Sequence, residues 1–422
     1  MLYIAASGSS AVPKNAIIHF IIQKSAKDWT KSFEKDLELR IEGCKEKKRK
    51  RDDLGSEKSN KKEDVGVVLP EKLVQNDSLL EFVTRNPQFI YQSHIIEDMI
   101  RQTSEGLTNL RCPIRSSEGT GGAYFMQNST GDKIVSIFKP ADEEPNAENN
   151  PHGLVASSNG EEGLKKGTKA GEGAIREVVA YLLDHPINKR RSFKNEGTGF
   201  AGVPPTSMVK CLHAGFNHPE ECKAKFGSLQ KFVENYGSCE EMGPCNFPVH
   251  EVHKISILDI RMANADRHAG NILISKDEEK GQYVLVPIDH GYCLPESFED
   301  CTFEWLYWPQ ARQSYSPETL AYIKSLDAEE DIATLKFYGW DLPQKCARTL
   351  RVSTMLLKKG AEQGLTPYTI GSIMCRDSLN KPSILEEILH EAQGSVLPSI
   401  NETTFLDSVS RIMDRRLAQV HK

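Results

Sequence analysis

The stretch that decides the fold is residues 264–274, which read NADRHAGNILI, together with a second apolar run that ends in VLVPIDHG at residues 284–291. Asp266 and Asn271 are five residues apart, and an apolar run of strand length follows them at once. Asp289 lies 18 residues after Asn271, at the end of the second run. Two carboxylates and an amide placed around two apolar strands predict a single site.

These three side chains fit phosphoryl transfer. In that reaction one Asp orients or deprotonates the attacking hydroxyl, while an Asn and a second Asp hold Mg²⁺ on the phosphates. Gly291, directly after Asp289, lets the chain turn into an activation segment. A metal site at His268 and His290, or two structural histidines, are alternatives, but neither explains the carboxylates and the amide together.

Two upstream elements fit the same chemistry. A glycine-rich stretch, SSEGTGGAYF at residues 116–125, separates two strand-like runs, and its backbone N–H groups can approach phosphates closely. It lacks the Gly-Lys-Ser/Thr of a Walker A loop, and an ordinary hairpin turn is the alternative. Lys139 ends an apolar run about 16 residues later, on one strand face with Val135 and Ile137. A kinase keeps its phosphate-pairing lysine at such a place.

A helix predicted at about 173–184 carries the expected partner of Lys139. Its apolar residues recur at i, i+3, i+4, i+7 and i+8, and His185-Pro186 ends it. Glu177 flanks the apolar stripe, so it is the candidate for the ion pair that holds a kinase lysine. An ordinary exposed glutamate is the alternative.

The remaining pattern predicts an α+β fold of two lobes. Residues 89–110 and 249–263 look helical, and residues 317–421 are mostly helical with breaks near Gly339, Gly364 and Pro382. Strands in the first third and helices in the last predict a β-rich N-lobe and a helical C-lobe.

Composition excludes some classes of protein. The 422 residues include 53 Lys plus Arg and 59 Asp plus Glu, a net charge of −6, which argues against a nucleic-acid-coating protein. No apolar run reaches the roughly 18–20 residues of a membrane helix. The ten cysteines form no C-x-x-C pair and are expected to be reduced thiols, with an irregular zinc site that includes Cys239 and Cys245 as the alternative.

The first hundred residues differ from the rest. Fifteen of the twenty residues at 45–64 are charged, which predicts a disordered linker over 45–68. Its basic run at 45–51, KEKKRKR, is of nuclear-localisation type or is a solvated tether. Residues 1–44 hold two apolar runs, too few strands to fold alone. Residues 69–100 are expected to be a lead-in to the folded part.

The motifs resemble those of a known family. Asp266-Arg267-His268-x-x-Asn271 with IDHG at 288–291 resembles the phosphatidylinositol 3-/4-kinase superfamily, whereas ordinary protein kinases use His-Arg-Asp and Asp-Phe-Gly. Three further runs look like the type II phosphatidylinositol 4-kinases: FKPADEEP at 138–145, GTGFAGVPPT at 197–206 and WLYWPQAR at 305–312. The stretch from about residue 101 to residue 416 is similar to their plant gamma class, also known for ubiquitin-like modules. The resemblance implies a bilobal catalytic domain at 101–422, with an N-lobe at about 101–230 and a C-lobe at about 234–422.

The resemblance also implies roles for single residues. Lys139, held by Glu177, would contact the nucleotide phosphates, Asn271 and Asp289 would hold the metal, and either Asp266 or His268 would be the base. The glycine loop that binds ATP would comprise Ser117, Glu118, Gly119, Thr120, Gly121, Gly122 and Ala123. The adenine-binding hinge between the lobes would comprise Gln230, Lys231, Phe232 and Val233. ATP and Mg²⁺ are the implied cofactors.

The implied activity is ATP- and Mg²⁺-dependent phosphorylation of the D4 hydroxyl of phosphatidylinositol. Protein Ser/Thr phosphorylation is the alternative, because residues 295–300 include Glu296, Glu299 and Asp300 but no lysine or arginine for an anionic headgroup, and because the gamma class is also associated with it. A non-enzymatic scaffold is disfavoured by the intact site residues. The aromatic run at 305–308 is either a membrane-contacting patch or buried core.

Partners and location follow from the same resemblance. Residues 17–27, IIHFIIQKSAK, resemble only a fragment of a ubiquitin-like module, so residues 1–44 are expected to be a partial or degenerate one. That leaves ubiquitin-pathway partners in doubt. The expected location is the cytoplasm with transient membrane contact, and the basic run leaves the nucleus open.

Overall fold

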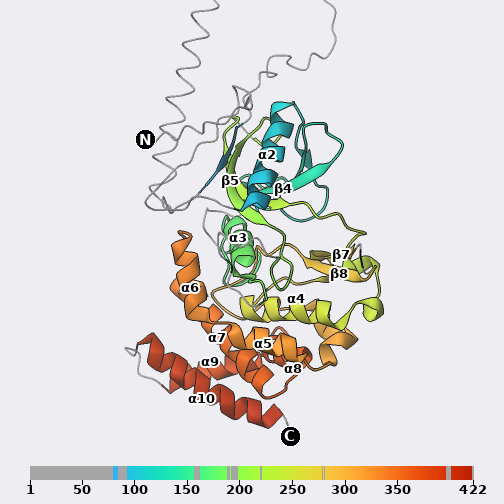
Figure 1. Cartoon of the computed structure of the whole chain (residues 1–422). Coiled ribbons are helices and arrows are strands. Elements are labelled where there is room, and N and C mark those ends of the chain that lie inside the picture. The colour runs from blue at the N-terminus through green and yellow to red at the C-terminus, as the bar shows by residue number, and fades with distance from the viewer. Residues whose placement is uncertain are drawn as a thin grey trace, which may run out of the picture.

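A computed structural model shows two lobes, a sheet-based one above a helical one (Figure 1). It describes residues 79–83, 93–155, 162–187, 191, 198–218, 221–277, 279, 281–395 and 401–420. The expected ubiquitin-like segment at 1–44 and the linker at 45–68 lie outside the described residues. The α+β fold of two lobes that the sequence predicts is confirmed.

The N-lobe is built on an antiparallel sheet in the order β1-β5-β6-β4-β3-β2. The strands are β1 (Leu79–Phe82), β2 (Ile114–Arg115), β3 (Tyr124–Gln127), β4 (Ile134–Pro140), β5 (Thr206–Leu212) and β6 (Lys225–Lys231). Strand β1 pairs with β5 over its whole length, Leu79 opposite Leu212 and Phe82 opposite Val209. The lobe therefore starts before the boundary expected at residue 101, because the supposed lead-in supplies an edge strand.

Two helices pack on this sheet. Helix α2 (His94–Thr108) lies against β3 and β4, where the Thr103 and Ser136 hydroxyls are 2.7 Å apart in the core. Helix α3 (Gly173–Leu183) lies directly below the sheet, between the lobes (Figure 1). It ends two residues before His185-Pro186, as the sequence predicts.

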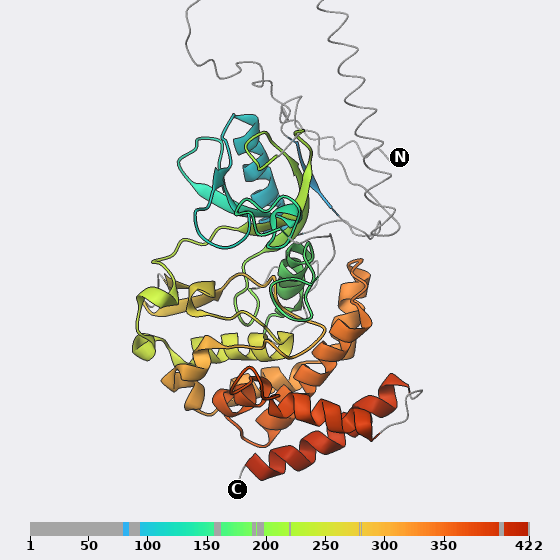
Figure 2. The same ribbon diagram turned by 180° about the vertical axis from the view of Figure 1, so that it is seen from behind.

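The C-lobe is helical apart from one hairpin, β7 (Ile272–Lys276) with β8 (Tyr283–Pro287). Its helices are α4 (Val249–Met262), α5 (Pro317–Ser325), α6 (Ala328–Phe337), α7 (Gln344–Glu362), α8 (Pro367–Met374), α9 (Ile384–Gly394) and α10 (Glu402–Val420). Helix α4 packs on α7 and α8, while α9 and α10 form the end of the lobe far from the sheet (Figure 2). The predicted helix at 249–263 and the predicted breaks are confirmed. Among the described residues, no helix is both long enough and apolar enough to cross a membrane.

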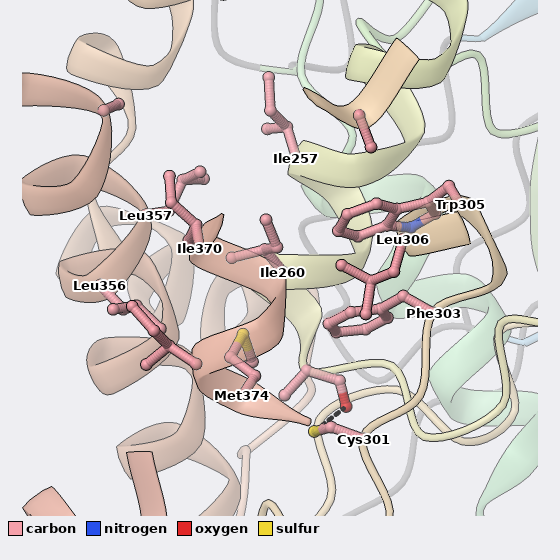
Figure 3. Close-up of a cluster of buried hydrophobic side chains, with 14 of the residues drawn as sticks. Ile257, Ile260, Cys301, Phe303, Trp305, Leu306, Leu356, Leu357, Ile370 and Met374 are labelled. Atoms are coloured by element: carbon pink, nitrogen blue, oxygen red, sulfur yellow. Dashed lines mark hydrogen bonds between the residues drawn. The ribbon is translucent and has the colours of Figure 1, made fainter. Parts of the chain in front are cut away.

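The aromatic run after the activation segment is mostly core. Trp305, Leu306 and Trp308 are buried, whereas the side chain of Tyr307 is 82% exposed. Figure 3 shows Trp305 and Leu306 among buried side chains of α4, α7 and α8. The membrane-patch interpretation is therefore wrong for three of the four residues, because their apolar surface already lies inside the C-lobe.

One wholly buried ion pair joins helix α4 to the loop that decides the fold. The Arg267 Nε donates to both carboxylate oxygens of Asp259, at 2.9 and 3.1 Å. Asp259 also accepts from the Trp305 indole N–H at 2.9 Å. The Arg267 Nη1 donates to the backbone carbonyls of Asn271 at 2.6 Å and Ile288 at 2.7 Å. Arg267 therefore fixes the ends of both strands that carry the expected metal ligands.

We expect Asp259→Asn to lower the free energy of unfolding by roughly 3–5 kcal/mol, because it leaves the Arg267 guanidinium buried without a counter-charge. Denaturant unfolding measures the loss. The matched control is Asp377→Asn, which removes an exposed carboxylate 3.4 Å from Lys381 and should change stability very little. Equal losses in the two variants would contradict the structural role of the buried pair.

Candidate active site

A pocket opens between the lobes and collects about half of the predicted residues, whereas Asp266, His268 and Asn271 are not part of its lining. Its lining includes Glu118, Gly119, Thr120, Gly121, Gly122, Ala123, Lys139, Glu177 and Asp289. The glycine loop forms one wall, and strand β4, helix α3 and the chain after β8 form the others. Segments far apart in the sequence therefore meet where the sequence predicts phosphate chemistry.

Strand β4 aims Lys139 into this pocket. Ser136 and Phe138 alternate with it and are buried, so Lys139 lies on the opposite strand face. Its Nζ is 2.5 Å from Glu177 Oε1, which confirms the predicted ion pair between β4 and α3. The Nζ is also 3.5 Å from Asp289 Oδ1. Burial alone would lower the pKa of Lys139, but the Asp289 and Glu177 carboxylates raise it above its usual value.

Glu177 serves two partners at once. Its second oxygen lies 3.3 Å from His290 Nδ1, and the His290 ring is wholly buried. Burial alone would raise the pKa of Glu177, but the Lys139 ammonium and the His290 ring outweigh it and hold that pKa well below its usual range. The carboxylate therefore stays ionised and keeps the lysine in place.

The β7–β8 hairpin brings the two expected metal ligands together. Ile272 pairs with Pro287, and the Ile288 N–H donates to the Asn271 carbonyl at 3.0 Å, so Asn271 and Asp289 leave the hairpin side by side. Asp289 has a φ of 54°, a left-handed conformation that is costly for a side-chain-bearing residue. Amide and carboxylate oxygens suit Mg²⁺, which takes few protein ligands and completes its shell with phosphate oxygens and water. The residues present fit a magnesium–nucleotide complex.

The two candidate bases differ in their surroundings. The Asp266 carboxylate is about one quarter exposed, and its backbone carbonyl accepts from the Asn271 amide at 3.0 Å. The His268 side chain is half exposed and lies 3.3 Å from Glu240 Oε1, on the 3-10 turn Cys239–Glu241. Asp266 is thus tied to Asn271, one of the expected metal ligands, whereas His268 faces another part of the C-lobe.

Close backbone contact explains part of the glycine loop. The Gly122 N–H donates to the Glu143 carbonyl at 2.9 Å, and a Cβ on Gly122 would lie 2.1 Å from Glu143 Oε2. Gly119 has a φ of +87°, which favours glycine. Ser117, predicted as part of the loop, lies outside the lining of the pocket.

The expected hinge lies where the sheet ends. Strand β6 ends with Gln230 and Lys231. The Lys231 N–H donates to the Pro205 carbonyl at 2.8 Å, and the Phe232 N–H donates to the Val135 carbonyl at 3.1 Å. Gln230, Lys231, Phe232 and Val233 do not line the pocket described above. Their contact with adenine stays a prediction.

Three acidic residues just after Lys139 support the site, and the sequence reasoning gave them no role. Asp142 and Glu143 pair with the buried Lys225, and Glu143 also accepts from the Tyr124 hydroxyl at 2.7 Å. Glu144 accepts from the N–H groups of Gly171 and Gly173 at 2.9 Å and of Ala174 at 2.7 Å, so it caps α3. The sequence does mark these residues, because the acidic run DEE at 142–144 directly follows Lys139-Pro140-Ala141 and belongs to a motif that resembles the family.

Helix α3 is also tied to the activation segment. The Arg176 guanidinium donates to the carbonyls of Cys293 at 2.5 Å and Leu294 at 2.6 Å. Glu177, the next residue, reaches His290 of the same segment. The position of α3 therefore couples Lys139 to the chain that follows Asp289.

Comparison with known proteins agrees with this geometry. Residues 119–370 match the family described as phosphatidylinositol 3- and 4-kinase. The chain is 57% identical to phosphatidylinositol 4-kinase gamma 4 and 55% identical to phosphatidylinositol 4-kinase gamma 3, both of Arabidopsis thaliana. Each match covers 96% of this chain, and 68% and 69% of the two relatives. Phosphatidylinositol 4-kinase gamma 4 of Oryza sativa subsp. japonica is 52% identical, with 95% of this chain and 67% of the relative covered.

We expect the Glu177 pairing to make stability sensitive to acid. Because the folded-state pKa lies below the unfolded value of 4.5, the pairing contributes its full stability above about pH 4.5 and loses it as the pH falls further. Denaturant unfolding between pH 3 and pH 7 should show a smaller loss in Glu177→Gln than in the unsubstituted protein. Glu318→Gln, on an exposed helix position, is the control and should retain the full loss. Identical pH dependence of Glu177→Gln and the unsubstituted protein would contradict the assignment.

Proposed function

Because the chain belongs to the phosphatidylinositol 3- and 4-kinase family and is therefore a kinase, we propose that it transfers the γ-phosphate of ATP to the D4 hydroxyl of phosphatidylinositol. The observation that carries this proposal is the pocket in which the Lys139 ammonium lies 2.5 Å from Glu177 Oε1 and 3.5 Å from Asp289 Oδ1. The substrate follows from the relatives, which are named as phosphatidylinositol 4-kinases. Since that lipid resides in membranes, the proposal includes peripheral membrane contact.

The residues divide the work of phosphoryl transfer. Lys139 binds the nucleotide phosphates, and the glycine loop covers them with backbone N–H groups. Asn271 and Asp289 would hold Mg²⁺, which supplies charge neutralisation and orientation of the γ-phosphate when bound. Kinases of this family use ATP, and we propose the residue roles above for this chain.

We assign the base to Asp266 rather than His268. The Asn271 amide donates to the Asp266 backbone carbonyl at 3.0 Å, which places Asp266 beside an expected metal ligand. The His268 ring is engaged near Glu240 instead. Asp266 would orient the acceptor hydroxyl and receive its proton as the new O–P bond forms.

Packing weakens the electrostatic objection to a lipid acceptor. Glu296 of the activation segment lies 3.0 Å from Lys345 Nζ and 3.6 Å from Lys169 Nζ. Glu299 lies 3.2 Å from the Arg376 guanidinium. Glu296 and Glu299 are therefore paired with cations from other elements, which removes part of the objection to a lipid acceptor.

The test supplies labelled ATP and Mg²⁺ together with phosphatidylinositol vesicles and, separately, a generic protein substrate. We expect label at the D4 position of the lipid, and none after Asp289→Ala or after chelation of Mg²⁺. Label in protein alone would overturn the lipid proposal and favour the Ser/Thr alternative. Activity equal to background in both the unsubstituted protein and Asp289→Ala would favour a scaffold.

Lys139→Met should reduce transfer by roughly 100-fold or more, because the ammonium that pairs with the phosphates is lost from a water-poor pocket. The matched control is Lys133→Met, which removes an exposed lysine from the turn before β4 and should leave the rate unchanged. Steady-state kinetics with ATP and the preferred acceptor measure both variants. Full activity in Lys139→Met would refute the role given to this lysine.

A further inference from the structure

The loop before α3 crosses from the N-lobe to the C-lobe, and none of the motifs above includes it. Residues 163–169 read GLKKGTK, and we call them the lysine loop. The loop is closed on itself, because Glu162 bridges to Lys169 and the Gly163 N–H donates to the Thr168 carbonyl at 2.8 Å. It is therefore a defined hairpin-like element.

The lysine loop docks on the activation segment through its backbone. The Glu296 N–H donates to the Gly167 carbonyl at 2.7 Å, and the Lys166 N–H donates to Asp300 Oδ2 at 2.7 Å. Gly167 has a φ of +75°, and a Cβ there would lie 2.7 Å from the Ser297 nitrogen. Only glycine combines this conformation with this close approach. The contact fixes the position of the neighbouring lysines.

Docking brings Lys165 to the proposed base. Its Nζ lies 2.8 Å from Asp266 Oδ1, and each side chain is a little over one quarter exposed. Arg267, the residue after Asp266, is wholly buried and donates to Asp259 and to two backbone carbonyls. Lys139 is paired with Glu177 and Asp289 instead. Lys165 is thus the cation that meets Asp266 from the solvent side.

We propose that Lys165 is a catalytic residue of the phosphoryl transfer proposed above, on which this inference rests. The acceptor hydroxyl oxygen forms a bond to the γ-phosphorus, the bond from that phosphorus to the β–γ bridging oxygen breaks, and its electron pair leaves with ADP. The hydroxyl proton passes to Asp266. Lys165 donates hydrogen bonds to the γ-phosphoryl oxygens and takes no part in the proton transfer.

The geometry gives Lys165 this role for a physical reason. Charge in the transition state spreads over the equatorial oxygens of the transferring group, while the acceptor hydroxyl lies between that group and its base. An ammonium has three donors, so one can stay on Asp266 while the others face the phosphoryl oxygens. A cation fixed in a partly buried site stabilises this charge far better than one in water.

The test compares Lys165→Met, Lys165→Arg and the matched control Lys166→Met. The Lys166 side chain is about half exposed and pairs with Glu162, directly before the loop, so its loss leaves the Asp266 contact intact. For each full-length variant we would measure kcat with phosphatidylinositol, with a protein acceptor and with water, the last as ATP hydrolysis. ATP affinity and thermal unfolding are measured separately.

We expect Lys165→Met to lower kcat roughly 100- to 1,000-fold with every acceptor that the unsubstituted protein uses, while ATP affinity changes less than about threefold. Lys165→Arg should recover part of kcat, and Lys166→Met should match the unsubstituted protein. Thermal unfolding should be alike in all three variants.

Several outcomes would overturn the inference. An unchanged kcat in Lys165→Met would make the lysine a bystander, and a higher kcat would make it a cap that occupies the place of the acceptor hydroxyl. A loss confined to ATP affinity would make it a nucleotide-binding residue. Failure of the lipid proposal is distinguishable, because then the unsubstituted protein labels no phosphatidylinositol while Lys165→Met still shows its loss with protein or water. If the unsubstituted protein transferred phosphate to no acceptor, both the lipid proposal and the role of Lys165 would be contradicted.

Discussion

The buried pair between Asp259 and Arg267 is the constraint on which the site depends. A guanidinium that is wholly removed from water needs a counter-charge and hydrogen-bond acceptors, and here Nε reaches Asp259 while Nη1 reaches the carbonyls of Asn271 and Ile288. Those carbonyls belong to the residues at the ends of β7 and β8. The same charge that stabilises the C-lobe therefore fixes the spacing between Asn271 and Asp289, the pair that would hold Mg²⁺.

Helix α3 connects the activation segment of the C-lobe to Lys139 of the N-lobe. Its N-terminus is held by the Glu144 carboxylate, and its middle carries Arg176 and Glu177, which bind the activation segment and Lys139. A shift of this helix would break contacts to both lobes at once. The family chemistry requires the lysine and the magnesium-binding Asp to be in place together, and α3 is the element that contacts both chain segments.

The acidic residues of the activation segment are paired locally with cations, and the net charge of the chain does not show this pairing. The chain carries a net charge of −6, and its activation segment is acidic, which by itself disfavours an anionic lipid. The lysine loop and the C-lobe cations Lys345 and Arg376 pair with those acids. The carboxylates of Glu296 and Glu299 are thus paired with cations from other parts of the fold, which an inspection of residues 295–300 alone would miss.

The sequence by itself determined the two-lobed α+β class and the main helices, and it pointed to Lys139, Glu177, Asn271 and Asp289 as candidate site residues. It could do so because strand alternation, helical periodicity and short fixed spacings are local, and each of these residues lies at the end or on a defined face of a regular element. Only the tertiary structure decided that β1 joins the N-lobe sheet, that Trp305 is core and that Lys165 meets Asp266. These contacts are made between residues more than 45 positions apart in the sequence, and no local sequence pattern encodes such long-range contacts.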